Sequence, residues 1–222
     1  MDELEFGQHW VYFCSLAERL DETKHYIDHG IHNIDGSNDL IHGEVYSNIF
    51  KQIIVLAASE FEVMSKVLCL RIGSEKNHMN IKDISSVILK KYPQITSFEV
   101  ITPFWITNPI GGWSVRDSKV EGLEWWNAYN SIKHGNKGAM KMATLRNAII
   151  SLGALYIINL YLMYEMFENL GFAFAYPAVY FKCKYMAYPV SSGEGKLPDF
   201  GNMTAQERIQ QDYLDMTTIL KK

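Results

Sequence analysis

Two polar side chains that could act together on a phosphate, Asn130 and His134, stand four residues apart in the middle of the sequence. The run from Trp125 to Lys133 predicts a short helix, and on a helix this spacing puts both side chains on one face. Gly135 follows, and because helices commonly end on a glycine we expect His134 in the last turn. The helix dipole favours a protonated imidazole at that end. The pair could therefore hold a phosphate oxygen and carry a proton to it.

The residues around this pair form a locally basic stretch. No Asp or Glu occurs from residue 125 to residue 164. The cations of that stretch are Lys133, Lys137, Lys141 and Arg146. RNA can be cleaved without metal if one group takes the 2′-hydroxyl proton, another protonates the leaving oxygen and a cation stabilises the phosphorane. The stretch thus predicts an anion or RNA site, with His134 as proton carrier. The plainer interpretation, a helix C-cap with Asn130 as a packing polar group, fits the same spacing.

Length and composition are those of an ordinary globular protein. The chain has 222 residues, 48% hydrophobic and 21% charged, so it can bury a core as one domain over 1–222. The formal net charge of −4 argues against indiscriminate coating of nucleic acid. Residues 1–45 hold ten acidic and two basic residues, a net of −8, so the remainder carries +4. We expect 1–38 to be an acidic helix and turn, and any nucleic-acid surface to lie later in the chain.

The pattern of apolar residues predicts a mainly α fold. Helices are expected over 10–27, 39–71, 81–92, 125–133 and 141–170. The second has a narrow apolar seam that suits lengthwise packing on another helix, with Phe50, Ile54, Ala57, Phe61, Met64 and Leu68. Asn80 predicts the cap of the third helix. Residues 94–118 lack helical signals and are expected to be an inserted loop or hairpin.

The end of the chain is aromatic and then polar. Alternation within 173–190 predicts one strand that pairs with the segment around Phe98, and the aromatic residues of 172–188 with Lys182 and Lys184 could stack on bases. A capping-box pattern at 204–207 predicts a last amphipathic helix, so 171–222 is expected to be an aromatic segment plus a C-terminal helix.

One stretch needs comparison with a membrane span. Residues 147–164 carry no charge for 18 residues, the lower edge of spanning length, but the central helix of a bundle has the same composition. We therefore expect no membrane contact.

The acidic start lacks the features of a secretion signal, and three scattered cysteines suit neither a disulfide framework nor a zinc site. A cytoplasmic protein is the expectation.

The run Tyr129-Asn130-Ser131-Ile132-Lys133-His134-Gly135, after two tryptophans and before a long apolar helix, resembles the HEPN superfamily. The family motif is an Arg, a polar residue that is often Asn, three intervening residues and a His. The resemblance covers roughly 39–170, which would form an HEPN-like core of four to five helices with a minor β or irregular insertion at 94–118. Members of the family dimerise so that two motifs face each other. Active members are metal-independent ribonucleases of toxin–antitoxin, CRISPR-linked and phage-defence systems, and others bind nucleotides or partners.

The resemblance implies a role for each matching residue. His134 would be the general acid/base and Asn130 the orienting group, with Lys133, Lys137, Arg146 and Tyr129 in contact with RNA. No cofactor is implied. The expected partners are RNA, a second copy of the chain and an antitoxin or regulatory protein.

The sequence departs from the motif at its arginine. Tyr129 occupies that position and cannot offer a fixed positive fork to a phosphate, so Lys133, Arg116 or Arg146 would have to replace it. The leading hypothesis is thus an RNA-directed protein, a metal-independent endoribonuclease if catalysis survives. The alternative is a non-catalytic HEPN-like binding or dimerisation module. Tyr129 packed in the core beneath His134 favours the module, whereas an arginine close to the motif favours the enzyme.

A second group of histidines supports a third hypothesis. His25 and His29 stand four apart, with His32 three residues further and Asp21 nearby. Imidazole and carboxylate groups at helical spacing could bind a divalent metal, which would indicate a metal-dependent helical-bundle enzyme. Gly30 interrupts the helix before His32, so an ordinary acidic helix end fits equally well.

Overall fold

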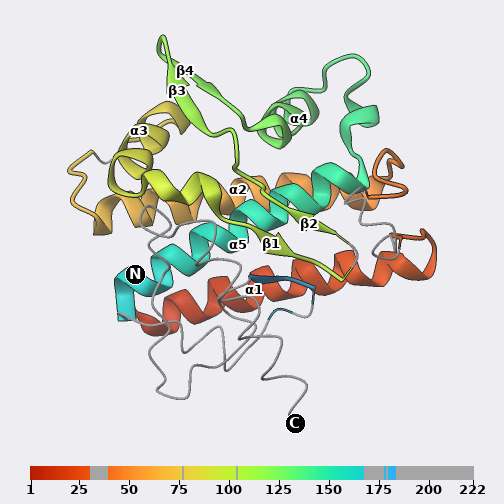
Figure 1. The fold of residues 1–222 in the computed structure, drawn as a ribbon, viewed down its shortest axis with the longest axis horizontal. Helices are drawn as coiled ribbons and strands as arrows, with labels where there is room; N and C mark the ends of the chain where they lie inside the picture. The colour runs from red at the N-terminus through yellow and green to blue at the C-terminus, as the bar shows by residue number, and fades with distance from the viewer. Residues whose placement is uncertain (31–39, 77, 104, 168–177, 179, 184–222) are drawn as a thin grey trace, which may run out of the picture.

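The computed structural model describes residues 1–30, 40–76, 78–103, 105–167, 178 and 180–183. Within these residues five α-helices make up most of the fold, which confirms the mainly α class (Figure 1). They are α1 (Glu3–Glu22), α2 (Asn48–Arg71), α3 (Ile81–Lys91), α4 (Glu124–Lys133) and α5 (Leu145–Phe167). Three 3-10 helices lie between them, η1 (Thr23–His25), η2 (Pro93–Ser97) and η3 (Ala139–Met142). The predicted last helix, at 204–220, falls outside the described residues.

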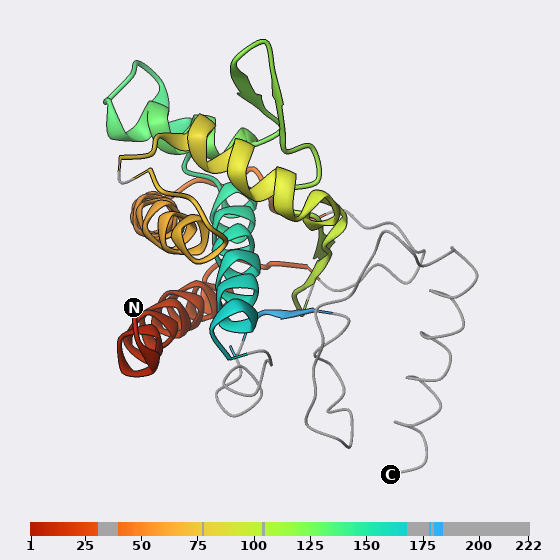
Figure 2. The ribbon, with the colours of Figure 1, turned by 90° about the vertical axis from the view of Figure 1, so that its left-hand side faces the viewer.

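Helix α5 is the centre of the molecule. Figure 2, which views α1 and α2 nearly end-on, shows α5 between these two helices and the small sheet. By length and composition α5 could cross a membrane, but 78% of its most apolar window is buried inside the fold. Its neighbours there are protein side chains, such as Phe13 and Phe181, whose rings lie 5.6 Å and 6.1 Å from the ring of Tyr156.

Helix α2 packs along α5 through the seam that the sequence predicted. All six of its seam residues are fully buried: Phe50, Ile54, Ala57, Phe61, Met64 and Leu68. The starts of the two helices are tied by an isolated bridge between Tyr46 and Thr144, and Ser47 donates its N–H to the Ala143 carbonyl at 3.1 Å. The two helices run in the same direction from that point (Figure 1). A pair of Glu62 and Lys66, 2.6 Å apart, lies beside the seam.

Three predicted helix starts are wrong, and side-chain caps explain two of them. Helix α1 begins at Glu3 instead of residue 10, because Asp2 accepts the N–H of Glu5 at 2.9 Å. Helix α2 begins at Asn48 instead of residue 39, because Ser47 accepts the N–H of Phe50 and residues 41–44 form turns. Helix α5 begins at Leu145, after η3 occupies 139–142.

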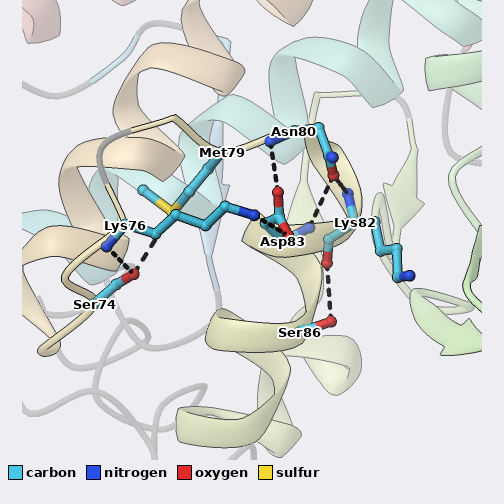
Figure 3. Close-up of polar contacts among 7 residues, drawn as sticks. All are labelled: Ser74, Lys76, Met79, Asn80, Lys82, Asp83 and Ser86. Carbon is cyan, nitrogen blue, oxygen red and sulfur yellow. Dashed lines mark hydrogen bonds and ion pairs between the residues drawn. The ribbon is translucent and has the colours of Figure 1, made fainter.

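The start of α3 follows the prediction. The Asn80 side chain accepts the N–H groups of Lys82 and Asp83 at 2.9 and 3.1 Å, and the Asp83 carboxylate accepts the N–H of Asn80 (Figure 3). This is a complete capping box. The Lys76 ammonium lies 2.7 Å from Asp83, and this hydrogen bond is the first cause that lowers the pKa of the Asp83 carboxyl. This ion pair joins Lys76, in the segment before α3, to the first turn of that helix.

The strands form two small sheets. Strand β1 (Val100–Ile101) pairs antiparallel with β2 (Ile106–Thr107) and with β5 (Lys182–Cys183). The pairing of β5 with β1 is the one predicted for the 173–190 segment, but the predicted alternation fails at Tyr180 and Phe181, which are both buried. Of that aromatic segment, only residues 178 and 180–183 are described.

Strands β3 (Ser114–Arg116) and β4 (Lys119–Glu121) form a hairpin that projects from the body beside α4 (Figure 1). Its turn places Asp117 and Ser118 at φ 46° and 64°, the left-handed region that a two-residue hairpin turn requires. At its base the backbones of Gly112 and Gly122 cross so closely that a Cβ on Gly122 would lie 1.8 Å from the Gly112 oxygen. This crossing directs the chain into α4.

Candidate functional site at the end of α4

Helix α4 presents the predicted polar face because its opposite face is anchored in the core. Trp125, Tyr129 and Ile132 are buried, and the Trp125 indole N–H donates to the Pro109 carbonyl at 3.1 Å. The Trp125 ring also packs edge-on against Phe61 of α2 at 5.0 Å. With these residues inward, Asn130 is half-buried and His134 is exposed.

The helix ends as Gly135 predicts. Gly135 adopts φ 64°, its N–H bonds to the Ile132 carbonyl at 3.2 Å, and the Asn136 N–H bonds to Ser131 at 3.1 Å. These two bonds are the Schellman arrangement, with His134 as the C-cap residue. The imidazole of His134 is therefore held at the surface by the backbone of the helix end.

Lys133 and Tyr129 form a contact that sequence reasoning missed. The Lys133 ammonium lies 5.3 Å from the centre of the Tyr129 ring, within cation–π range. A hydrogen bond to Tyr129 is the first cause that raises the pKa of Lys133, and the charge of Glu62 adds to it. The i, i+4 spacing of the two residues was the available signal. The contact keeps a positive charge at the exposed end of α4.

Tyr129 itself belongs to the core. Its side chain is 3% exposed, and its ring lies 5.0 Å from that of Trp126. A guanidinium at this position would lose its hydration, so the position suits an aromatic ring better than the arginine of the family motif.

The two arginines that could replace the motif arginine have other partners. The Arg146 guanidinium lies 5.1 Å from the centre of the Trp105 ring, and its Nε donates to Glu44 at 3.2 Å. Arg116 lies on β3, with its Nε 3.9 Å from the Glu121 carboxylate. Thus the structure brings Tyr129, Asn130, Lys133 and His134 together on one helix, with exposed Lys137 in the loop after it. Arg146 lies at the start of α5.

We compared the chain with protein-family models, with curated proteins and with solved structures, and none of them matches it. The HEPN resemblance accordingly rests on the motif residues alone.

The N-terminal histidines are differently placed. His29 is 1% exposed, and its Nε2 and Nδ1 lie 2.9 Å from the Thr23 hydroxyl and 3.0 Å from the Tyr180 hydroxyl. Both ring nitrogens are thus in use, whereas His25 is exposed on η1 and residue 32 lies outside the described residues. Among the described residues, no group of three His, Cys, Asp or Glu side chains is arranged to hold a metal ion.

Cys14 and Cys69 are poor nucleophiles. Burial raises the pKa of the Cys69 thiol to about 12 and that of the Cys14 thiol to about 11. Both are protonated near neutral pH, and a thiol attacks only as the thiolate. The exposed end of α4 is therefore the better candidate site.

Proposed function

We propose that this protein is a non-catalytic, HEPN-like RNA-binding module of a prokaryotic defence or toxin–antitoxin system. The end of α4, with Lys133, His134 and Lys137, is its RNA-binding surface. The observation that carries the proposal is that Tyr129 is buried and that the Lys133 ammonium lies over its ring. A tyrosine thus stands where the family motif has its catalytic arginine, and the positive charge comes from Lys133. An ammonium is a point charge that can contact a phosphate without the bidentate geometry of a guanidinium.

The charge of the surface supports a polyanion as ligand. Lys133, His134 and Lys137 are exposed, and the whole run from 125 to 164 lacks acidic residues. The neighbouring carboxylate, Glu62, lies 2.6 Å from the Lys66 ammonium. Such a surface binds phosphates through charge, so its affinity should fall steeply as salt rises.

A ribonuclease is the second candidate, and the exposed imidazole favours it. His134 stands one helical turn from Asn130 with Lys133 beside it, which provides a proton carrier, an amide and a cation. Within one copy of the chain, catalysis would then still lack a fixed fork on the phosphate and a second group to protonate the leaving oxygen. As in other members of the family, a homodimer would bring two copies of this face together in either case.

One experiment separates the two candidates. Purified wild type and His134→Ala are incubated with single-stranded RNA in EDTA, and both cleavage and binding are measured. We expect wild type to bind RNA without cleaving it. Cleavage by wild type that disappears in His134→Ala would overturn the module in favour of the ribonuclease.

Binding is tested with a matched pair of double variants. Lys133→Ala with Lys137→Ala should reduce the slope of log affinity against log salt by about 1.4, since each contact with single-stranded RNA contributes about 0.7. The control is Lys90→Ala with Lys91→Ala on α3, because the Lys91 ammonium also lies over a tyrosine ring, that of Tyr92, at 5.9 Å. Equal slopes for the two double variants would show that the end of α4 is not the RNA-binding surface.

A further inference from the structure

A concave surface opens on the first turns of α2. It has a volume of about 490 Å³ and is lined by Asn48, Lys51, Gln52, Val55 and Leu56. Volumes of roughly 300–1,000 Å³ are usual for small-ligand sites, so this α2 pocket is large enough for a nucleotide unit.

The polar groups of the α2 pocket are mainly hydrogen-bond donors. An Arg19 Nη2 group on α1 donates to the Gln52 side-chain oxygen. Because a guanidinium can only donate, the carbonyl of Gln52 must face Arg19, which turns the amide N–H groups away from α1. Lys51 adds an exposed ammonium, which also only donates. The pocket therefore suits a ligand rich in acceptors and negative charge.

One turn further along the same face of α2, the lining of the α2 pocket is apolar. Val55 and Leu56 are only half-buried and line it together. A ligand that fills the pocket needs a flat apolar face as well as acceptor groups. A nucleobase with its phosphate has both, since its ring atoms contact the aliphatic side chains and its edge accepts from an amide.

The chain connects the α2 pocket to the end of α4. From His134 it runs through the loop and η3, which carry the exposed Lys137 and Lys141, to Ala143. The Ala143 carbonyl accepts the N–H of Ser47 at 3.1 Å, directly before α2 begins. Figure 1 shows this connection at one end of the molecule. A ligand bound along it would meet positive charge between the two surfaces.

We infer that the α2 pocket is a second contact for the RNA bound at α4, and that it takes one nucleobase against Val55 and Leu56 with its phosphate on Lys51. The inference rests on the proposed function. It gives the RNA a path from the end of α4, past Lys137 and Lys141, to the first turns of α2.

The test compares single-stranded RNAs of about 4 and about 12 nucleotides, because only the longer one can occupy both surfaces. Lys51→Ala and Gln52→Leu change exposed side chains, so the fold should persist. We expect each to weaken the binding of the longer RNA about five- to tenfold and to leave the shorter one nearly unchanged. Lys90→Ala on α3, which also removes an exposed lysine, is the control and should change neither.

The outcomes separate the inference from the proposed function. If Lys133→Ala weakens binding but Lys51→Ala and Gln52→Leu do not, the inference is wrong and the proposed function stands. If Lys51→Ala weakens binding and Lys133→Ala does not, the α2 pocket stands and the α4 surface is wrong. If wild type binds neither RNA, both fail.

Discussion

The two candidate histidines, His134 and His29, have different surroundings. His134 is exposed at the C-cap of α4, held by backbone bonds that leave its ring at the surface. His29 is buried, with its ring between the hydroxyls of Thr23 and Tyr180. The first can meet a ligand, and the second joins the end of α1 to the segment before β5. Burial, more than residue type, thus separates a candidate site from a structural contact.

The hydrogen bonds of His29 determine its tautomer. The Thr23 hydroxyl donates to the Leu20 carbonyl at 2.7 Å, so it must accept from His29, which places a proton on Nε2. In the neutral ring Nδ1 is then an acceptor for the Tyr180 hydroxyl. The contrast between the two histidines has four measurable consequences.

The largest effect is expected for His29→Ala. The substitution opens a cavity and leaves the buried Tyr180 hydroxyl without its acceptor, so stability should fall by about 3–5 kcal/mol. Urea unfolding followed by circular dichroism measures the loss. A loss below about 1 kcal/mol would show that the hydrogen bonds of His29 with Thr23 and Tyr180 contribute little to stability.

Tyr180→Phe should have a smaller effect, about 1–3 kcal/mol, because it keeps the ring and removes only the hydrogen bond to Nδ1 of His29. The same unfolding measurement applies. Combined with His29→Ala, the two changes should be far from additive, since both remove one hydrogen bond. Additive losses would contradict the contact between these side chains.

The third consequence is a dependence of stability on pH. Burial is the first cause that lowers the pKa of His29 in the folded protein, against opposing charges from Asp21 and Asp28. Above the unfolded pKa of about 6.5 both states are neutral and stability is unaffected. Below it the unfolded chain binds a proton first, so stability falls by up to about 1.4 kcal/mol per pH unit until the folded pKa is reached.

Unfolding midpoints at pH 7.5 and pH 5.5 test this prediction. In His29→Gln the midpoints at the two pH values should differ less than they do in wild type. In the control, His134→Gln, they should differ as much as in wild type. If His29→Gln has the wild-type pH dependence, another group is responsible.

The smallest effect on stability is expected for His134→Ala. The side chain is exposed, so we expect a change within about 0.5 kcal/mol. RNA affinity should nevertheless fall, because the substitution removes an exposed hydrogen-bonding imidazole from the proposed binding surface. Unchanged affinity would remove His134 from that surface.

Local signals in the sequence predicted the parts of the fold that depend on local hydrogen bonds. Asn80 marked the start of α3, Gly135 the end of α4, and the seam of α2 its buried face. Two of the three wrong starts arise where an earlier or later cap replaces the expected one, at Asp2 and at Ser47. Periodicity alone cannot choose among several competent cap residues.

The candidate site was predicted less completely. The spacing of Asn130 and His134 placed them on one helix, and the structure agrees. The partners of Arg146, Glu44 and Trp105, come from other parts of the chain, and no local pattern indicates them. The same holds for the contact of His29 with Tyr180, which joins residues far apart in the sequence.

The bridge that ties Tyr46 to Thr144 also bears on how the molecule folds. The two longest helices of the described chain begin side by side there, yet α3, α4 and both hairpins lie between them in the sequence. The chain must therefore close a long loop before its main core contact forms, at an entropic cost that precedes the gain from burial. Refolding should be slower than in bundles whose packed helices are neighbours in sequence, because contacts between distant segments slow folding.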